Sequence, residues 1–377
     1  MAGIYIHIPF CKQACHYCDF HFSTSVKKKH ELVQSLCREQ ELRKSELIET
    51  VETIYFGGGT PSLLTAEELD LLLECVDTNY SIIDSPEITL EANPDDLTPE
   101  KIRELSDSKV NRLSIGIQSF FEEDLKMMNR AHNVKEALEC IKNAIPHFKN
   151  ISVDLIYGIP GMTRDRWLEN IRTAISLGVP HLSCYALTIE PKTALDNFIK
   201  KGLMAPMDDA LAQEHYTILI EETEKMGFIN YEFSNFGKEG YQSQNNMAYW
   251  RGKSYLGIGP SAHSYDGTVR SWNVNNNTKY IKSIEKNQLP LEREVLSEKD
   301  KYNEYIMTRL RTQWGVSLRE VDENFGRDYR KYLMTQAQRS IENELLSLEN
   351  NILTITKKGK FLCDGIAADL FLVNLEF

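Results

Sequence analysis

The sequence predicts an α/β protein: an incomplete (β/α)6 TIM-like barrel followed by a small, mainly helical, winged-helix-like domain. Six short β-rich runs alternate with amphipathic, charge-rich stretches, which is the rhythm of a parallel sheet. Polar or glycine-containing segments follow several strand ends, which favours an incomplete barrel over an open doubly wound sheet, although the pattern alone does not separate the two. From about Leu296 the rhythm gives way to helices followed by a short β ribbon.

The elements of the barrel are expected in a regular order along the chain. Strands are expected at residues 3–10, 53–56, 87–91, 112–118, 151–157 and 181–187. Helices are expected at residues 28–45, 65–79, 133–144 and 164–177, because apolar residues recur there at helical spacing. Thr65 and Glu68 have the spacing of a capping box, which marks the start of the second helix.

After the sixth strand the rhythm weakens, and residues 230–266 are rich in Gly, Asn, Tyr and Ser. We expect this segment to extend the barrel and cap its mouth. Helices at 297–313, 317–324 and 329–346, a strand at 352–356 and a last helix then complete the chain. These changes divide the sequence into units at residues 1–230, 231–290 and 291–377.

Composition and charge exclude several classes of protein. Of the 377 residues, 42% are hydrophobic and 26% charged, as in ordinary globular proteins. No stretch approaches the ~20 apolar residues of a membrane span, although association at a membrane surface is compatible with the sequence. The net charge of -12 argues against nucleic-acid binding, even though winged-helix modules often bind DNA. The first residues show no export signal, so we expect a cytoplasmic protein with reduced cysteines.

Three cysteines, Cys11, Cys15 and Cys18, directly follow the first strand, where a barrel places its active site. Three thiolates can hold one iron–sulfur cluster and leave one iron open, whereas a structural zinc site takes four ligands. The alternatives are three buried cysteines, or a zinc site completed by one of the nearby histidines, which are His7, His16 and His21.

Further motifs accompany the cysteines: Tyr5-Ile-His-Ile-Pro-Phe10, Tyr55-Phe-Gly-Gly-Gly-Thr-Pro-Ser62, Glu91-Ala-Asn-Pro94, Gly116-Ile-Gln-Ser-Phe120, Asn129-Arg-Ala-His132 and Asp154-Leu-Ile-Tyr-Gly-Ile-Pro160. Together they resemble the radical S-adenosylmethionine (SAM) enzymes, and among these the oxygen-independent coproporphyrinogen III oxidase family. The resemblance runs from Tyr5 into the C-terminal module. It implies a radical-SAM barrel, a [4Fe-4S] cluster on the three cysteines, and SAM bound at the fourth iron. The SAM-side residues that it implies are Tyr5, Tyr17, Gly58, Gly59, Thr60, Glu91, Gln118, Arg130, Asp154 and Ala186.

Several of these residue types suit a SAM site on physical grounds. The glycines at 57–59 allow close backbone approach to a ligand, although a glycine triplet is more often only a turn. Glu91 and Asp154 can accept hydrogen bonds from ribose hydroxyls or the SAM ammonium group, or they can be solvated acids at strand ends. Arg130 can pair with the SAM carboxylate, or it can make a surface salt bridge. Gln118 is polar at the end of an apolar strand and needs a partner.

Two departures from the oxidase pattern indicate the branch of the family. Oxidases carry a fourth cysteine where this chain has Phe20, and a haem chaperone subfamily has Phe there. That subfamily also carries a His-Asn-x-x-Tyr-Trp motif. Here Tyr249 and Trp250 are present but Asn245 replaces the histidine, and an amide is a poor axial ligand for haem iron. The segment could instead be a loop with an aromatic pair on the barrel rim, and His263 is a second candidate to face the cavity.

The sequence therefore predicts a radical-SAM [4Fe-4S] protein of the haem chaperone branch. Such a protein would bind haem or a related porphyrin, with weakened iron ligation because of Asn245, and pass it to a haemoprotein. The recipient and the electron donor are not identified by the residues. The alternatives are an oxidase that decarboxylates coproporphyrinogen III in porphyrin biosynthesis, and a radical enzyme acting on another substrate.

Overall fold

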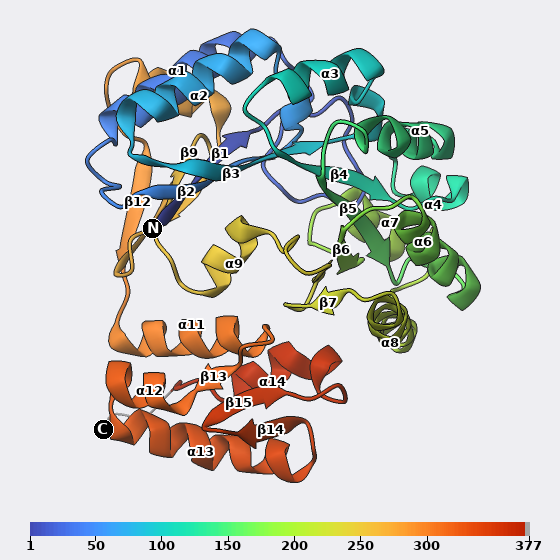
Figure 1. Ribbon diagram of the computed structural model, residues 1–377, viewed down its shortest axis with the longest axis vertical. Helices are drawn as coiled ribbons and strands as arrows, with labels where there is room; N and C mark the ends of the chain where they lie inside the picture. The colour runs from blue at the N-terminus through green and yellow to red at the C-terminus, as the bar shows by residue number, and fades with distance from the viewer. Residues whose placement is uncertain (374–377) are drawn as a thin grey trace.

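A curved parallel sheet forms the centre of the fold in the computed structural model, which describes residues 1–373 (Figure 1). Each strand pairs in parallel with the next one along the chain. In order these strands are β1 (Ala2–Ile8), β2 (Val51–Gly58), β3 (Ile82–Ala92), β4 (Arg112–Gln118), β5 (Asn150–Tyr157) and β6 (His181–Ala186). Within the described residues, β1 and β6 do not pair with each other, and other strands extend both edges. The incomplete barrel is confirmed.

The region after β6 builds both edges of the sheet. On the β6 side lie the antiparallel strands β7 (Ile229–Asn230) and β8 (Asn235–Gly237). On the β1 side lie β9 (Tyr255–Ile258), which is parallel to β1, and the antiparallel strands β10 (His263–Tyr265), β11 (Val269–Asn273) and β12 (Leu291–Val295). These strands are too short for periodicity to reveal them from sequence. Between the two edges, α9 (Gln244–Trp250) lies on the inner side of the sheet (Figure 1).

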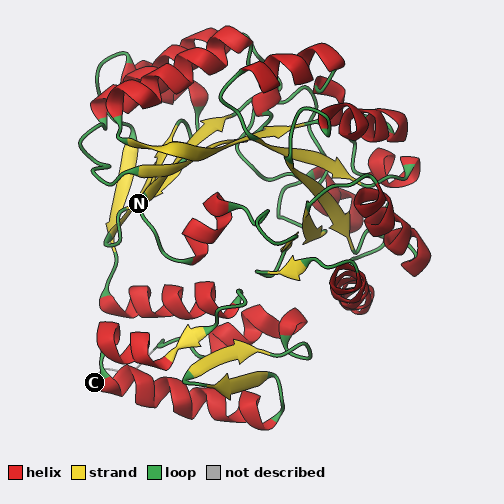
Figure 2. Cartoon of the chain, in the orientation of Figure 1, coloured by secondary structure: helices red, strands yellow, loops and turns green. Residues whose placement is uncertain are grey.

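Helices cover the outer face of the sheet, as Figure 2 shows. They are α1 (Lys29–Leu42), α2 (Ala66–Asn79), α3 (Pro99–Asp107), α4 (Glu122–Met127), α5 (Val134–Ala144), α6 (Arg164–Ser176), α7 (Ala194–Lys200), α8 (Asp209–Lys225) and α10 (Asn277–Ile284), with short 3-10 turns at Pro61–Leu63 and Pro94–Asp96. The expected capping box of Thr65 and Glu68 is present at α2. Strand residues such as Ile4, Phe56 and Leu113 are fully buried beneath the helices, which anchors the strand ends that carry the site.

A separate hydrophobic core forms in the C-terminal domain, built around residues such as Tyr302, Leu333 and Leu353. Its helices are α11 (Glu298–Leu310), α12 (Leu318–Phe325), α13 (Arg327–Glu342) and α14 (Cys363–Asp369), with a 3-10 turn at Lys360–Leu362. Its strands β13 (Val316–Ser317), β15 (Ile352–Ile355) and β14 (Leu346–Glu349) form one small antiparallel sheet. The expected order of helices and ribbon is confirmed. Residues 374–377 of the unit expected at 291–377 lie outside the described residues.

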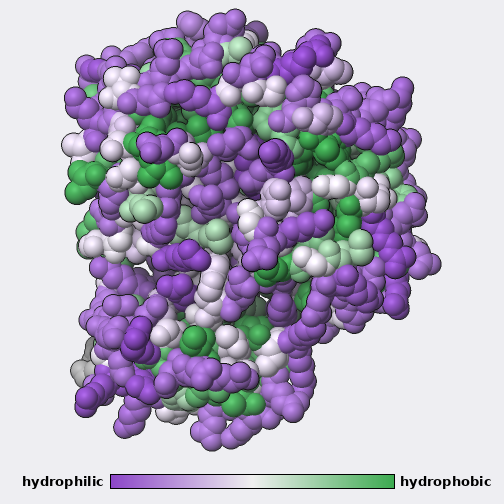
Figure 3. Space-filling view, in the orientation of Figure 1, coloured by the Kyte–Doolittle hydropathy of each residue, from purple (hydrophilic) through white to green (hydrophobic). Residues whose placement is uncertain are grey.

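None of the helices within residues 1–373 is both long enough and apolar enough to cross a membrane. On the face shown in Figure 3 the helices present mostly hydrophilic residues, and hydrophobic residues are visible near the junction between the barrel and the C-terminal domain. The cavity described below lies at this junction.

Candidate functional site

The loop that carries Cys11, Cys15 and Cys18 leaves β1 at the carboxyl end of the sheet. All three thiols are free and half-buried. The Cys18 backbone N–H donates to the Cys15 carbonyl at 3.4 Å, and the His16 N–H donates to the Met128 carbonyl at 3.0 Å, which ties the loop to the segment after α4. No three His, Cys, Asp or Glu side chains within residues 1–373 are grouped to hold a single metal ion.

The three nearby histidines are engaged elsewhere. The His16 Nδ1 lies 2.9 Å from the Met127 carbonyl, and the His21 Nε2 lies 2.7 Å from Asn277 Oδ1. The His7 ring is bonded on both sides, with Nδ1 3.1 Å from the Tyr5 hydroxyl and Nε2 3.0 Å from the His21 carbonyl. These bonds give the histidines structural roles in the loop and disfavour the alternative of a zinc site completed by one of them.

Arg130 brings a buried positive charge to the cysteine loop. Its Nη1 donates to the Cys15 Sγ at 3.3 Å and lies 3.5 Å from the Tyr17 hydroxyl. Its Nη2 donates to Asn93 Oδ1 at 2.7 Å and to the Gly116 carbonyl at 2.8 Å, which fixes the guanidinium. Its Nε is buried and has no acceptor among residues 1–373. The donor set fits an iron–sulfur cluster, because a guanidinium stabilises thiolates, and the spare N–H suits a carboxylate ligand.

The glycines after β2 allow the backbone to pass close to the first strand. Gly58 has a φ of +108°, and a Cβ at this position would lie 2.5 Å from the His7 ring. A Cβ at Gly59 would lie 2.7 Å from the Phe10 carbonyl oxygen, so no side chain fits there either. Thr60, which follows them, is buried and accepts a hydrogen bond from Asn93 Nδ2 at 3.2 Å. The triplet is therefore a close approach of strands and more than a surface turn.

Two carboxyl groups lie at the strand ends beside this backbone. Glu91 accepts from the Tyr55 hydroxyl at 2.8 Å and from the Gly58 N–H at 3.1 Å, and Asp154 accepts from the Ser114 hydroxyl at 3.1 Å. Burial raises the pKa of Glu91 to about 7 and that of Asp154 to about 6, and the nearby Asp154 carboxylate also raises the pKa of Glu91. Such a pair can accept hydrogen bonds or balance a cationic ligand, so these acids are not merely solvated.

The remaining expected residues lie at the same end of the sheet. Tyr5 stacks on Tyr55, with ring centroids 6.0 Å apart. Gln118 ends β4 in the left-handed region, with φ 67°, and is almost fully buried. Ala186 is the last residue of β6 and is half-buried. The left-handed backbone of Gln118 is strained, and such strain at the end of a strand is typical of functional sites.

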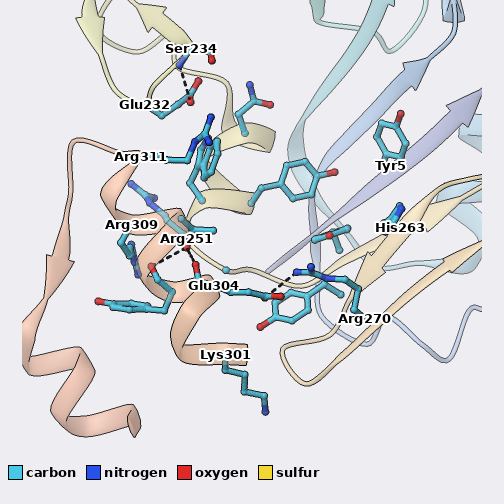
Figure 4. A pocket seen from close by; sticks show the side chains of 18 of the residues that line it. Tyr5, Glu232, Ser234, Arg251, His263, Arg270, Lys301, Glu304, Arg309 and Arg311 are labelled. Carbon is cyan, nitrogen blue, oxygen red and sulfur yellow. Dashed lines mark hydrogen bonds and ion pairs between the residues drawn. The ribbon is translucent and has the colours of Figure 1, made fainter. Parts of the chain in front are cut away.

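A cavity of about 1110 Å³ opens between the barrel mouth and α11 of the C-terminal domain. Figure 4 shows Tyr5 and His263 on its barrel side, and Arg251, Arg309 and Arg311 together on the opposite side. Aromatic side chains line much of it, among them Phe20, Tyr185, Tyr249, Trp250, Tyr255 and Tyr305. The cavity includes Tyr5 and His7, so it reaches the strand ends where the expected SAM residues lie.

The position expected to carry an iron ligand does not line this cavity. Asn245 is almost fully buried, and its Oδ1 accepts from the Thr53 hydroxyl at 3.1 Å. Its backbone N–H donates to Glu87 Oε1 at 3.0 Å, which holds the start of α9 against β3. In this arrangement residue 245 faces the sheet, because the hydrogen bonds of the α9 N-terminus fix its direction. The next residue, Asn246, is on the cavity wall.

His263 does line the cavity, as the sequence suggested. Its ring stacks on Trp272 with centroids 6.0 Å apart, and neither ring nitrogen has a hydrogen-bond partner in the described part of the chain. Burial, followed by the nearby Arg270, lowers the pKa of His263, which favours the neutral imidazole that can bind a metal.

Sequence reasoning missed several residues that complete the site. Tyr55 and Asn93 stood inside the quoted motifs, and strand alternation places Tyr5 and His7 on one face, so a signal for these residues was available. Arg309 and Arg311 had none, because they come from the C-terminal domain and reach the cavity only through tertiary packing.

Comparisons with known proteins agree with this geometry. The sequence model of the radical SAM superfamily matches residues 5–174, and that of the HemN C-terminal domain matches residues 296–362. The chain is 34% identical to the heme chaperone HemW of Bacillus subtilis (strain 168), over 96% of this chain and 97% of that protein. The chain belongs to the HemW family of radical SAM proteins. The heme chaperone HemW of Lactococcus lactis subsp. lactis (strain IL1403) is also 34% identical, over 99% of this chain and 98% of that protein.

A solved structure shares the fold of this HemW family member. Coproporphyrinogen III oxidase (HemN) from Escherichia coli, a radical SAM enzyme, superposes with a TM-score of 0.86, over 98% of this chain and 90% of that one. At 20% identity this likeness establishes the fold, including the C-terminal domain. Membership of the radical SAM family implies a [4Fe-4S] cluster and SAM.

Proposed function

We propose that this protein binds haem in the cavity between the barrel and the C-terminal domain and delivers it to a haemoprotein. The cavity carries the proposal, because its volume of about 1110 Å³ exceeds the ~300–1,000 Å³ of most small-molecule sites and suits a large ring. Aromatic side chains such as Tyr249, Trp250 and Tyr255 offer faces on which a flat ring can stack.

In the proposed site, Cys11, Cys15 and Cys18 would hold a [4Fe-4S] cluster, and residues at the carboxyl end of the sheet would hold SAM. When bound, the cluster would supply an electron to SAM. Arg130 would pair with the SAM carboxylate, since its Nε has no acceptor, and Glu91 and Asp154 would accept hydrogen bonds or balance the cationic ligand. The full set proposed to contact SAM is Tyr5, Tyr17, Gly58, Gly59, Thr60, Glu91, Gln118, Arg130, Asp154 and Ala186.

For the haem iron we propose His263 as the axial ligand in this chain. Its ring nitrogens have no partner within residues 1–373, and it faces the cavity, whereas Asn245 faces the sheet. In this proposal His263 provides the iron ligand in place of the motif histidine, which this chain lacks.

The oxidase alternative is disfavoured at Phe20. This side chain is 68% exposed and lines the cavity near Cys18, at the position where oxidases carry a further thiol.

We also propose the division of the chain at residues 1–230, 231–290 and 291–377, and a cytoplasmic location.

The test is anaerobic reconstitution followed by parallel haem-binding and decarboxylation assays. The native protein is expected to hold about four irons per chain, to bind haem, and to release no CO2 from coproporphyrinogen III. Replacing Cys15 with Ala should abolish iron binding, whereas Cys75→Ala, on the outer helix α2, should not. His263→Ala should shift the Soret band of bound haem. SAM-dependent CO2 release, or failure to bind haem, would contradict the proposed function.

A further inference from the structure

Two arginines at the corner between α9 and the C-terminal domain each lie over a tryptophan of the other element. The guanidinium carbon of Arg251, which ends α9, is 4.6 Å from the ring centroid of Trp314. That of Arg311, directly after α11, is 5.6 Å from the centroid of Trp250. Stacking uses the flat face of a guanidinium and leaves its in-plane N–H donors available. The two stacks therefore hold the N–H donors of two guanidinium groups at the edge of one cavity.

Most of these donors have no acceptor in the described part of the chain. The side chain of Arg251 makes no hydrogen bond or ion pair with any of residues 1–373. Arg311 donates from Nη1 to Asp364 at 2.7 Å, but its Nε is buried and finds no acceptor in the part of the chain that the structure describes. Arg309 lines the same wall and is bonded to Glu320 at 3.2 Å. A buried donor without an acceptor, such as the Nε of Arg311, lowers stability, and an anionic ligand oxygen would relieve that cost.

The charge of the cavity points to an anionic ligand. Five cationic and three acidic side chains line it, an excess of two positive charges in a chain whose net charge is -12. Two of those acids are already neutralised, Glu304 by Arg270 at 3.0 Å and Glu320 by Arg309. Lys301 points away from the arginines in Figure 4, so the unused positive charge inside the cavity is that of Arg251. One ligand carboxylate would pair with Arg251, and a second would accept a hydrogen bond from the Nε of Arg311, which has no acceptor within residues 1–373.

We propose that Arg251, Arg309 and Arg311 form a carboxylate subsite that binds the two propionate groups of a tetrapyrrole. The inference rests on the proposed haem function and deepens it by fixing the orientation of the ring. In this orientation the propionate edge would lie at the α9–α11 corner, and the iron would lie toward His263, which is on the wall opposite the arginines (Figure 4). Arginine forks match carboxylates in geometry, so the subsite selects tetrapyrroles with free propionates.

The test compares haem with haem dimethyl ester, which keeps the ring and the iron but lacks the carboxylates. Absorbance titrations should show that the native protein binds haem at least about tenfold more tightly than the ester. Arg251→Met should weaken haem binding about tenfold and leave ester binding unchanged, and Arg251→Lys should recover part of the loss. Arg319→Met is the matched control, because Arg319 is 80% exposed on α12 and lies 3.7 Å from Glu323, away from the cavity. It should change neither affinity.

The outcomes separate this inference from the function on which it rests. Equal affinities of the native protein for haem and its ester would overturn the subsite and leave the haem function standing. Binding of neither compound would overturn both. If Arg251→Met unfolds at a markedly lower temperature, its affinities are set aside. The subsite is then judged from the affinities of the native protein and of Arg251→Lys for haem and for the ester, because neither measurement uses the Met variant.

Discussion

At the scale of single residues, the site combines buried charges of both signs within the strand ends. Arg130 is fixed by four acceptors around the cysteine loop, whereas Glu91 and Asp154 repel each other and are desolvated. Without a ligand the two acids therefore cost stability when ionised, and a cationic ligand such as SAM would relieve that cost. Such a site stores part of its binding free energy in the free protein.

The stability cost of ionised Glu91 should appear as a pH-dependent difference in unfolding free energy between the native protein and the Glu91→Gln variant. Folding raises the pKa of Glu91 from 4.5 to about 7, so the unfolded chain ionises first, and native stability falls as the pH rises from about 4.5 to 7. The unfolding free energy of Glu91→Gln relative to the native protein should rise over that window, by up to roughly 3 kcal/mol, and level off above it. Denaturant titrations of the ligand-free protein measure it.

Two further variants move the upper limit of this pH window, which is the pKa of Glu91 in the folded protein, in opposite directions. Tyr55→Phe removes a hydrogen bond that lowers this pKa, so the upper limit should rise. Asp154→Asn removes a repelling charge, so the upper limit should fall toward 4.5. A stability difference between Glu91→Gln and native that is independent of pH would contradict the raised pKa.

At the scale of elements, α9 carries much of the cavity wall and is held by its N-terminal end. Glu87 on β3 accepts from the backbone N–H of Gln244 at 3.1 Å and of Asn245 at 3.0 Å. The Ser243 hydroxyl caps the helix by accepting from the Asn246 N–H at 3.2 Å. A carboxylate at a helix N-terminus is favourable for both hydrogen bonding and the helix dipole. The anchoring aims the other end, with Tyr249, Trp250 and Arg251, at the cavity.

Glu87→Ala should loosen α9 and weaken haem binding without contacting the ligand. It leaves two backbone N–H groups without their acceptor, so we expect a loss of about 1–3 kcal/mol in stability and faster hydrogen exchange in α9. Thr98→Ala removes the cap of α3, outside the cavity, at a similar cost of ~1 kcal/mol. In that variant the exchange of α9 and the haem affinity should stay at native values. Unchanged α9 exchange in Glu87→Ala would show that other contacts hold the helix.

At the scale of the whole molecule, the cavity joins two units with separate cores. Its walls come from the sheet, from α9 and from α11, and the Arg251–Trp314 and Arg311–Trp250 stacks cross the junction. A ligand that touches both walls binds the folded, assembled protein and not the unfolded chain. Binding should therefore stabilise the whole molecule and the arrangement of its two parts.

Haem binding should slow hydrogen exchange in α9 and α11 together. At a free concentration 100 times the dissociation constant, the stability gained is about 2.7 kcal/mol, so the unfolding midpoint should also rise. Helix α13 lies on the far side of the C-terminal domain (Figure 1) and provides an internal control, whose exchange should change little below global unfolding. Protection confined to α11 would place the ligand outside the barrel mouth.

The sequence by itself determined the parallel barrel strands, the cysteine loop and the family, because periodicity, glycine positions and residue spacing are local properties of the chain. Cys15 follows β1, Glu91 is next to the last residue of β3 and Asp154 lies in the second half of β5, and parallel strands bring such residues together toward one end of the sheet. Only the tertiary structure decided the edge strands β7 to β12 and the direction of residue 245. Only it brought Arg309 and Arg311 to the cavity. These features depend on contacts between distant segments, and no local pattern encodes which way a short helix such as α9 turns when Glu87 binds its end.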